Sequence, residues 1–244
     1  MNVPLTVTER RSEVDRRIRE ACARCGRSPE EIGIIAVTKY VSAAAALEAL
    51  RCGLPNLGEN RWQDAEAKWR AITEQTAAWP EPERPIWHFI GSLQTNKVKE
   101  VVGRFAYIHS LDRLSLAQAI DRKAGQLGIK VPCFIQVNVS GEHSKHGLAP
   151  EELIDFARTV APLPNVEIAG LMTMAPYESE PEETRPVFRG LRLLRDELNQ
   201  RAVLPSEAKG LSMGMSNDFE IAVEEGATWL RLGTILVGKE EAAQ

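Results

Sequence analysis

The sequence predicts an α/β protein, a single (β/α)8 TIM barrel with an extra N-terminal helix. Short apolar runs alternate with helical stretches eight times between residues 32 and 238. Such alternation produces a parallel sheet, because a parallel crossover needs an intervening helix. The length of 244 residues matches the ~250 residues of one barrel. No linker or repeat divides the sequence, so we expect residues 1–244 to form one domain.

The first predicted element is a helix over about residues 8–27. Val14, Ile18 and Cys22 recur every four residues and form a narrow apolar stripe. The arginines of this segment fall mostly on other faces, and we interpret them as a solvated surface. The barrel itself is expected over about residues 32–238.

Each predicted strand is a short run of apolar residues, many of them β-branched or aromatic. The first run, IGIIAV, is apolar on both faces, as a strand between a barrel core and outer helices requires. The eight runs are Ile32–Val37, Leu54–Leu57, Ile86–Ile90, Phe105–His109, Val131–Val139, Val166–Met172, Lys209–Met213 and Trp229–Leu232.

Helices are predicted between these runs, and proline or glycine ends some of them. They lie at Ala43–Leu50, Arg61–Thr76, Thr95–Val102, Leu114–Leu127, Pro150–Val160, Pro181–Arg201 and Asp218–Glu225, with a short last helix near Ile235. An open, doubly wound sheet is the alternative fold. Its first strand is usually followed by a glycine-rich phosphate turn, whereas AVTKYVS contains no glycine.

Composition and charge exclude several functional classes. The net charge of −4 at pH 7 offers no general attraction to nucleic acid or an anionic membrane. We find no apolar run of the ~18 residues that a membrane span needs and no secretory signal, so a cytoplasmic protein is expected. The four cysteines form neither a disulfide framework nor a zinc-ligand pattern. No metal is expected, and Cys22 and Cys25 are interpreted as reduced helix residues.

The active site of such a barrel lies at the carboxyl ends of the strands. Lys39 is the only one of the nine lysines that follows an apolar strand there. A lysine in an apolar mouth loses solvation, which favours its neutral, nucleophilic form. That form makes a Schiff base with a carbonyl compound. The alternative is a lysine whose ammonium group extends to solvent at the rim.

The turns after the seventh and eighth strands contain glycine and hydroxyl residues. Ser216 follows the seventh strand, and Gly233 and Thr234 follow the eighth. Barrels frequently bind phosphate with these two loops, where glycine allows close approach and hydroxyl and N–H groups donate. Ordinary helix capping by the same residues is the alternative.

Arg231, two residues before Gly233, is expected to point into the same mouth. A Schiff-base lysine beside a phosphate site indicates either a phosphosugar aldolase or a protein that binds pyridoxal 5′-phosphate (PLP). An arginine only donates hydrogen bonds, so beside the pyridine nitrogen of PLP it keeps that nitrogen unprotonated. A salt-bridged arginine without a ligand contact is the alternative.

The segments IIAVTKYV, LGENRWQ, WHFIGSLQTNK, GLMTMAP and LSMGMSNDFEIAVEEGATWLRLGT occur in this order. With them the chain resembles the pyridoxal phosphate homeostasis proteins over about residues 8–238. This resemblance implies the barrel of the N-terminal domain of alanine racemase. It also implies PLP held as an aldimine of Lys39, with phosphate contacts from Ser216, Gly233 and Thr234.

The resemblance further implies that Asn60 faces the cofactor, that Arg231 lies near the pyridine nitrogen, and that Met172 and Met174 line the pocket. Trp62 departs from the smaller aliphatic residue expected in LGENRWQ, and we interpret it as a change in helix packing. Trp229 in the last strand is also bulky. The partners implied are PLP, amino acids and PLP-dependent apoenzymes, and we expect a monomer.

The family is implicated in balancing PLP and amino-acid or keto-acid pools, so no catalytic residue is assigned. A racemase needs acid–base groups on both faces of the substrate α-carbon. In alanine racemase a tyrosine from a second domain supplies the second group, and here only Tyr177 is placed to reach the mouth. Arg231 would also make PLP a weaker electron sink. A low-activity PLP-dependent racemase or lyase, or a PLP-free aldolase, is the alternative.

Overall fold

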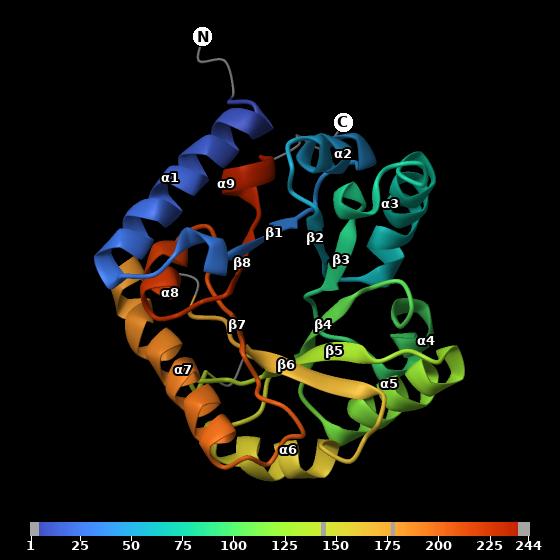
Figure 1. Ribbon diagram of the computed structural model, residues 1–244, viewed down its shortest axis with the longest axis vertical. Helices are drawn as coiled ribbons and strands as arrows, with labels where there is room; N and C mark the ends of the chain where they lie inside the picture. Colours follow the sequence, from blue (N-terminus) through green and yellow to red (C-terminus); the bar gives the residue numbers. More distant parts are fainter. Residues whose placement is uncertain (1–4, 143–144, 177–178, 239–244) are drawn as a thin grey trace.

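The computed structural model describes residues 5–142, 145–176 and 179–238, and these form a closed barrel of eight parallel strands in the order β1 to β8. Figure 1 looks into the ring of strands and shows the helices around its outside. The barrel closes where β1 pairs with β8, with Gly33 opposite Trp229 and Ala36 opposite Leu232. The predicted fold class is therefore confirmed.

The strands lie close to the predicted runs. They are β1 Gly33–Val37, β2 Asn56–Glu59, β3 Ile86–Phe89, β4 Tyr107–Leu111, β5 Val131–Gln136, β6 Val166–Met172, β7 Gly210–Ser212 and β8 Trp229–Leu232. Strands β2 and β4 begin two residues later than predicted. Pro55 has no N–H to donate to a strand ladder, and the N–H of Phe105 donates to the carbonyl of Val101 at the end of the preceding helix.

Strand β5 ends three residues earlier than predicted. The N–H of Asn138 donates to the carbonyl of Leu148, so the chain has already turned into the next loop.

The helices also follow the prediction. They are α1 Val7–Cys25, α2 Ala43–Arg51, α3 Trp62–Gln75, α4 Val98–Val101, α5 Leu114–Leu127, α6 Leu153–Val160, α7 Arg185–Gln200, α8 Phe219–Glu224 and α9 Thr234–Val237. Three predicted helices begin with a 3-10 turn, at Thr95–Lys97, Pro150–Glu152 and Pro181–Thr184. Within the described ranges, none of the helices is long and apolar enough to cross a membrane.

Glycines on two strands make room for large side chains of other strands in the barrel. A methyl group on Gly33 of β1 would lie 2.4 Å from the ring of Trp229 on β8. A methyl group on Gly210 of β7 would lie 2.5 Å from the ring of Phe134 on β5. Both separations are shorter than carbon atoms tolerate, so each aromatic ring depends on the glycine facing it.

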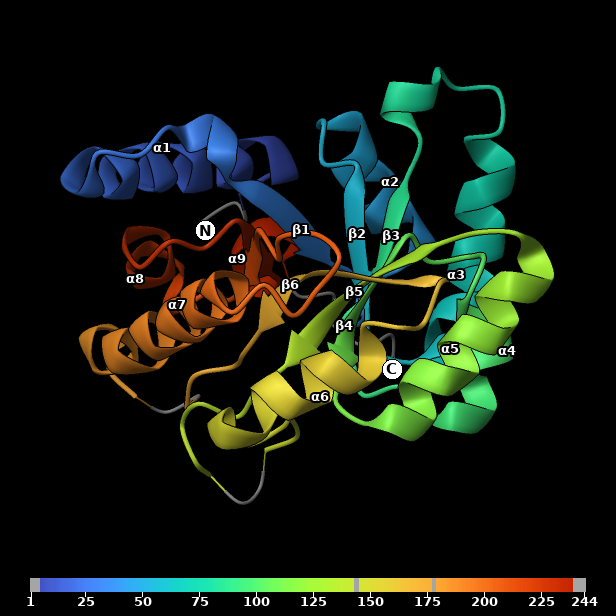
Figure 2. The same cartoon turned by 60° about the horizontal axis from the view of Figure 1, so that its bottom comes forward.

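Helix α1 lies beside α8 and α9 on the outside of the barrel, as Figures 1 and 2 show. It begins at a capping box in which Thr6 and Glu9 exchange hydrogen bonds, and it ends at Gly26, whose φ of 71° favours glycine. Its predicted stripe of Val14, Ile18 and Cys22 is buried, while Cys25 at its end is exposed. The helix is therefore docked through its one apolar face.

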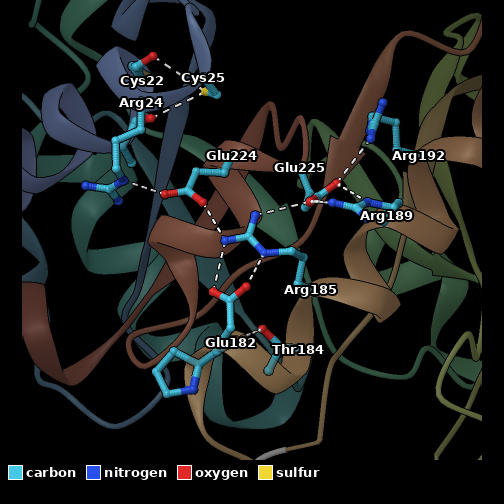
Figure 3. Close-up of polar contacts among 12 residues, drawn as sticks. Cys22, Arg24, Cys25, Glu182, Thr184, Arg185, Arg189, Arg192, Glu224 and Glu225 are labelled. Atoms are coloured by element: carbon cyan, nitrogen blue, oxygen red, sulfur yellow. Dashed lines mark hydrogen bonds and ion pairs between the residues drawn. The ribbon is translucent and has the colours of Figure 1, made fainter.

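Ion pairs at the end of α8 connect α1 and α7 to it (Figure 3). Glu224 accepts from Arg24 of α1 and from Arg185 of α7, both at 2.6 Å. Glu225, which is only 3% exposed, accepts from three arginines of α7, namely Arg185, Arg189 and Arg192. Burial alone would raise the pKa of Glu225, but these hydrogen bonds outweigh it and lower the pKa to about 2.

We predict that Glu225→Gln lowers the free energy of unfolding at pH 7 by about 2 kcal/mol, because charged hydrogen bonds to three arginines are lost. The folded pKa lies below the ordinary value of 4.5, so the carboxylate stabilises the fold above that pH. This contribution disappears as the pH falls towards the folded value. Urea unfolding across this range should therefore show the gap between wild type and variant closing with acid.

The control is Glu197→Gln, which breaks an exposed pair with Arg201 and should cost less than about 0.5 kcal/mol. A gap for Glu225→Gln that is as wide at about pH 3 as at pH 7 would contradict the assignment.

Candidate functional site

The structure brings all eight predicted site residues to the carboxyl end of the barrel. The strands are parallel, so residues at or just beyond their last positions share one mouth. Met172 and Arg231 lie within the last two residues of β6 and β8. Thr234 is the first residue of α9, directly after the turn that follows β8. The other five follow a strand directly or lie in the next loop, and they are Lys39, Asn60, Met174, Ser216 and Gly233. Their contacts to a ligand stay predictions.

Lys39 is half-buried at the rim, so its surroundings are less apolar than the sequence predicts. Its Nζ lies 4.8 Å from the ring centroid of Tyr40, and that ring is 81% exposed. A cation over an exposed ring gains about 0.5–1 kcal/mol. The amine thus lies beside a largely exposed aromatic side chain at the rim.

A buried ion pair that the sequence analysis missed fixes the backbone before Lys39. The hydroxyl of Thr38 donates to Oε1 of Glu59 at 2.7 Å. Nζ of Lys68 in α3 donates to the same oxygen at 2.9 Å and also to the carbonyl of Thr38. Glu59 and Thr38 are fully buried. Strand β1, strand β2 and helix α3 are therefore joined at the residue before the predicted Schiff-base lysine.

The sequence pattern of α3 indicates that Lys68 is buried. It shares a helix face with Ala65 and Ile72, both of which are buried. A lysine on an apolar stripe needs a buried partner, and Glu59 at the end of a strand supplies it. Oε2 of Glu59 is buried and has no hydrogen-bond partner among the described residues.

Arg231 lies deep in the mouth and spans the ends of β6 and β7. Its Nη1 donates to Oγ of Ser212 at 2.8 Å, and its Nη2 donates to the carbonyl of Thr173 at 2.9 Å. Burial lowers the pKa of Arg231 to about 10, against the opposing effect of nearby Asp218, so the side chain stays charged at pH 7. It is held by two neutral oxygens, rather than by the salt bridge that was the alternative.

The two loops predicted to bind phosphate do not use their hydroxyl groups as helix caps. The N-cap of α8 is Asp218, two residues after Ser216, and the N-cap of α9 is Gly233. Thr234 is exposed and Ser216 is half-buried. In the β7–α8 loop, the N–H of Met215 donates to Oδ1 of Asp218 at 2.5 Å. The structure therefore does not support the alternative in which Ser216 and Thr234 are ordinary helix caps.

The remaining predicted residues lie at the same end of the barrel. Asn60 lies against Gly91, where a methyl group would be 2.2 Å from the Asn60 carbonyl. Met172 is buried. The carbonyl of Met174 accepts a hydrogen bond from Lys145 at 3.3 Å, so the β5–α6 loop crosses towards β6 at this point.

Trp62 takes no part in the mouth. It is the first residue of α3, and its ring lies 5.9 Å from Trp69 and 6.3 Å from Phe105. Its ring therefore packs between α3 and the segment before β4, and its effect on helix packing stays a prediction.

Comparison with known proteins places this barrel in a class. The family described as "Alanine racemase, N-terminal domain" matches residues 11–241. The pyridoxal phosphate homeostasis protein of Aquifex aeolicus is 44% identical over 239 residues, which cover 97% of this chain and 100% of that protein. A parallel barrel with a lysine after β1 and an arginine on β8 is thus of the alanine racemase N-terminal type. The chain belongs to the pyridoxal phosphate homeostasis protein family.

Solved structures agree with this assignment. A structure described as that of an unknown protein from Bifidobacterium adolescentis has a TM-score of 0.85 and is 32% identical, and the match covers 96% of this chain and 98% of that one. PipY of Synechococcus elongatus, solved with PLP bound, has a TM-score of 0.76 and is 37% identical. That match covers 91% of this chain and 100% of PipY. The resemblance inferred from the sequence is confirmed.

We predict that Lys68→Met lowers the free energy of unfolding by about 3 kcal/mol, because it leaves the Glu59 carboxylate buried without its cation. The double variant Lys68→Met/Glu59→Gln should recover most of this loss, since no buried charge remains. Urea unfolding of the three proteins measures both effects. Lys99→Met, at a 74% exposed side chain, is the control and should change little. A double variant as unstable as Lys68→Met would contradict the prediction.

Proposed function

We propose that this protein binds PLP at the carboxyl end of its barrel, covalently through Lys39, and acts in PLP homeostasis rather than in turnover. The observation that carries the proposal is the meeting of a primary amine and a donor-only guanidinium at one barrel end. A solved family member with PLP bound supports it.

The residues of the mouth fit the three parts of PLP. The aldehyde carbon condenses with the amine of Lys39 to a Schiff base, and its oxygen leaves as water. The hydroxyl groups of Ser216 and Thr234, and the close backbone approach that Gly233 allows, suit the phosphate. Asn60 and Met174, which are half-buried, and Met172, which is buried, suit the wall of the pocket. The donor set therefore matches the cofactor group by group.

Arg231 suits the pyridine nitrogen in particular. The guanidinium has five N–H donors and no acceptor, and two of these donors bond Ser212 and Thr173. With a pKa of about 10, it is charged at neutral pH and favours a pyridine nitrogen that accepts a hydrogen bond. An unprotonated pyridine withdraws electrons less strongly, so it supports carbanion chemistry poorly.

The proposed lack of turnover rests on the proton-transfer groups of the mouth. Racemisation needs one acid–base group on each face of the α-carbon, and Lys39 supplies one. Tyr177, which the sequence suggests as the other, lies outside the described residues. A low-activity racemase or lyase is the second candidate, and the proton-exchange measurement below separates the two.

The cellular setting is part of the same proposal. We take the protein to be a cytoplasmic monomer that receives PLP, exchanges it with amino acids, and passes it to PLP-dependent apoenzymes. The chain has a net charge of −4 and so has no general attraction to nucleic acid. This charge supports small molecules or proteins as its partners.

We predict that Lys39→Ala abolishes the covalent adduct. Wild type mixed with PLP should show a near-visible absorbance band that borohydride removes, and peptide mapping should place the reduced pyridoxyl group on Lys39. Lys97→Ala, in the turn before α4, is the control and should retain the band. Adduct at the wild-type level in Lys39→Ala would disprove the attachment, and a wild type that cannot be loaded with PLP would favour the aldolase alternative.

We predict that α-proton exchange of L- and D-alanine is far slower than ~1 s⁻¹, the lower end of ordinary enzyme rates. The expected slow rate rests on two features, a single acid–base group assigned to the mouth and a weak electron sink, and both act on the same deprotonation step. Stoichiometric PLP-loaded protein in deuterated water, followed by NMR, measures the rate, with free PLP as the reference. Exchange or racemisation at ~1 s⁻¹ or faster would show that the protein is an enzyme.

A further inference from the structure

A series of hydrogen bonds crosses the barrel interior and ends at Arg231. Oδ1 of Asn56 lies 3.0 Å from Nε2 of His88, and Nδ1 of His88 lies 3.0 Å from Nε2 of His109. Nδ1 of His109 lies 2.9 Å from Oγ of Ser212, which accepts from Arg231 at 2.8 Å. We call these five residues the interior series.

The interior series has only one direction. Because the Asn56 oxygen can only accept, Nε2 of His88 carries the proton and donates to it. The other nitrogen of a neutral His88 must then accept, so His109 donates from Nε2 and accepts at Nδ1. The hydroxyl proton of Ser212 fills that acceptor. Ser212 is left with lone pairs facing Arg231, and an arginine can only donate to them.

Neither imidazole of the interior series is positively charged beside the arginine. Burial lowers the pKa of His88 to about 3. Burial, with added repulsion from His88 and Arg231, lowers the pKa of His109 well below its ordinary value. Both rings therefore stay neutral at physiological pH, which the direction of the series requires.

Stacking fixes the planes of both rings. The ring of His109 lies parallel to that of Phe134, with centroids 4.4 Å apart and planes 9° apart. The ring of His88 lies parallel to that of Tyr107, at 4.7 Å and 8°. Rotation of either imidazole would break its stack as well as its hydrogen bonds, so the acceptor offered to Ser212 points in one direction.

We propose that His109 is a positioning residue which, through Ser212, holds the guanidinium of Arg231 in the orientation that meets the pyridine nitrogen of PLP. This inference rests on the proposed function. Without the acceptor on His109, the Ser212 hydroxyl is free to turn its proton towards the guanidinium and repel it. The arginine would then lose one of its two fixed contacts, and the remaining one, to Thr173, leaves it free to pivot.

The test compares two ligands that differ only at the pyridine nitrogen. One is PLP, and the other is its carbocyclic analogue, in which a CH group replaces that nitrogen while the aldehyde and phosphate remain. The main variant is His109→Phe, which retains an aromatic ring to stack on Phe134 but has no acceptor. Ser212→Ala removes the acceptor of Arg231 directly and serves if His109→Phe does not fold. Ile108→Val, one residue earlier on β4, is the matched control for a change in the core.

Dissociation constants are measured by absorbance titration, with thermal unfolding to check each fold. His109→Phe should weaken PLP binding about tenfold and the analogue less than about twofold, since only PLP offers a nitrogen to Arg231. The ¹⁵N chemical shift of pyridine-labelled PLP should also move in His109→Phe and stay at the wild-type value in Ile108→Val.

Equal weakening for both ligands, or unchanged affinity for PLP with an unchanged nitrogen shift, would overturn the proposal and leave the interior series a purely structural part of the core. A wild-type protein that binds neither ligand would instead disprove the proposed function. The two failures are therefore distinguishable in one set of titrations.

Discussion

The pairing of β1 with β8 is the contact on which the rest of the structure depends. It closes the barrel, and its register places Ile35 opposite Arg231, so the strand before Lys39 runs beside the strand of the buried arginine. The pairing is possible because Gly33 leaves space for the ring of Trp229. The candidate site therefore joins residues near both ends of the sequence, and any change that opens this pair of strands separates its two cations.

Two buried cations near the mouth, Lys68 and Arg231, have partners of different kinds. Lys68 is neutralised by Glu59, so the ion pair behind Lys39 adds no net charge to the mouth. Arg231 is held only by neutral oxygens in its hydrogen bonds to Ser212 and Thr173, so its positive charge remains available. The two histidines of the interior series, His109 and His88, stay neutral because burial opposes a second charge. In the proposed function this surplus charge favours an anionic ligand that also accepts hydrogen bonds.

The sequence predicts the strands well because each is an apolar run between turns, and the parallel barrel then follows from eight repeats. The same topology predicts which residues reach the mouth, including Lys39 and Arg231. Contacts between distant segments are less accessible. The hydrogen bond from Ser212 to His109 joins residues 103 positions apart, and it depends on strand register, including the irregularity between β4 and β5. Nothing in the local pattern around a single histidine encodes that register.

The ion pairs of α1 have a consequence for how the chain folds during synthesis. Arg17 and Glu220 are 203 residues apart, so α1 is among the first segments to leave a ribosome and its partners on α8 and α9 are among the last. Until they emerge, Val14, Ile18 and Cys22 lack the two helices against which α1 mainly packs. Domains of this size expose apolar surface in their folding intermediates, and here that exposure lasts for nearly the whole time of translation. Arg16 and Arg19, which stay exposed on α1 in the folded barrel, give the undocked helix a charged face that favours contact with water during this time.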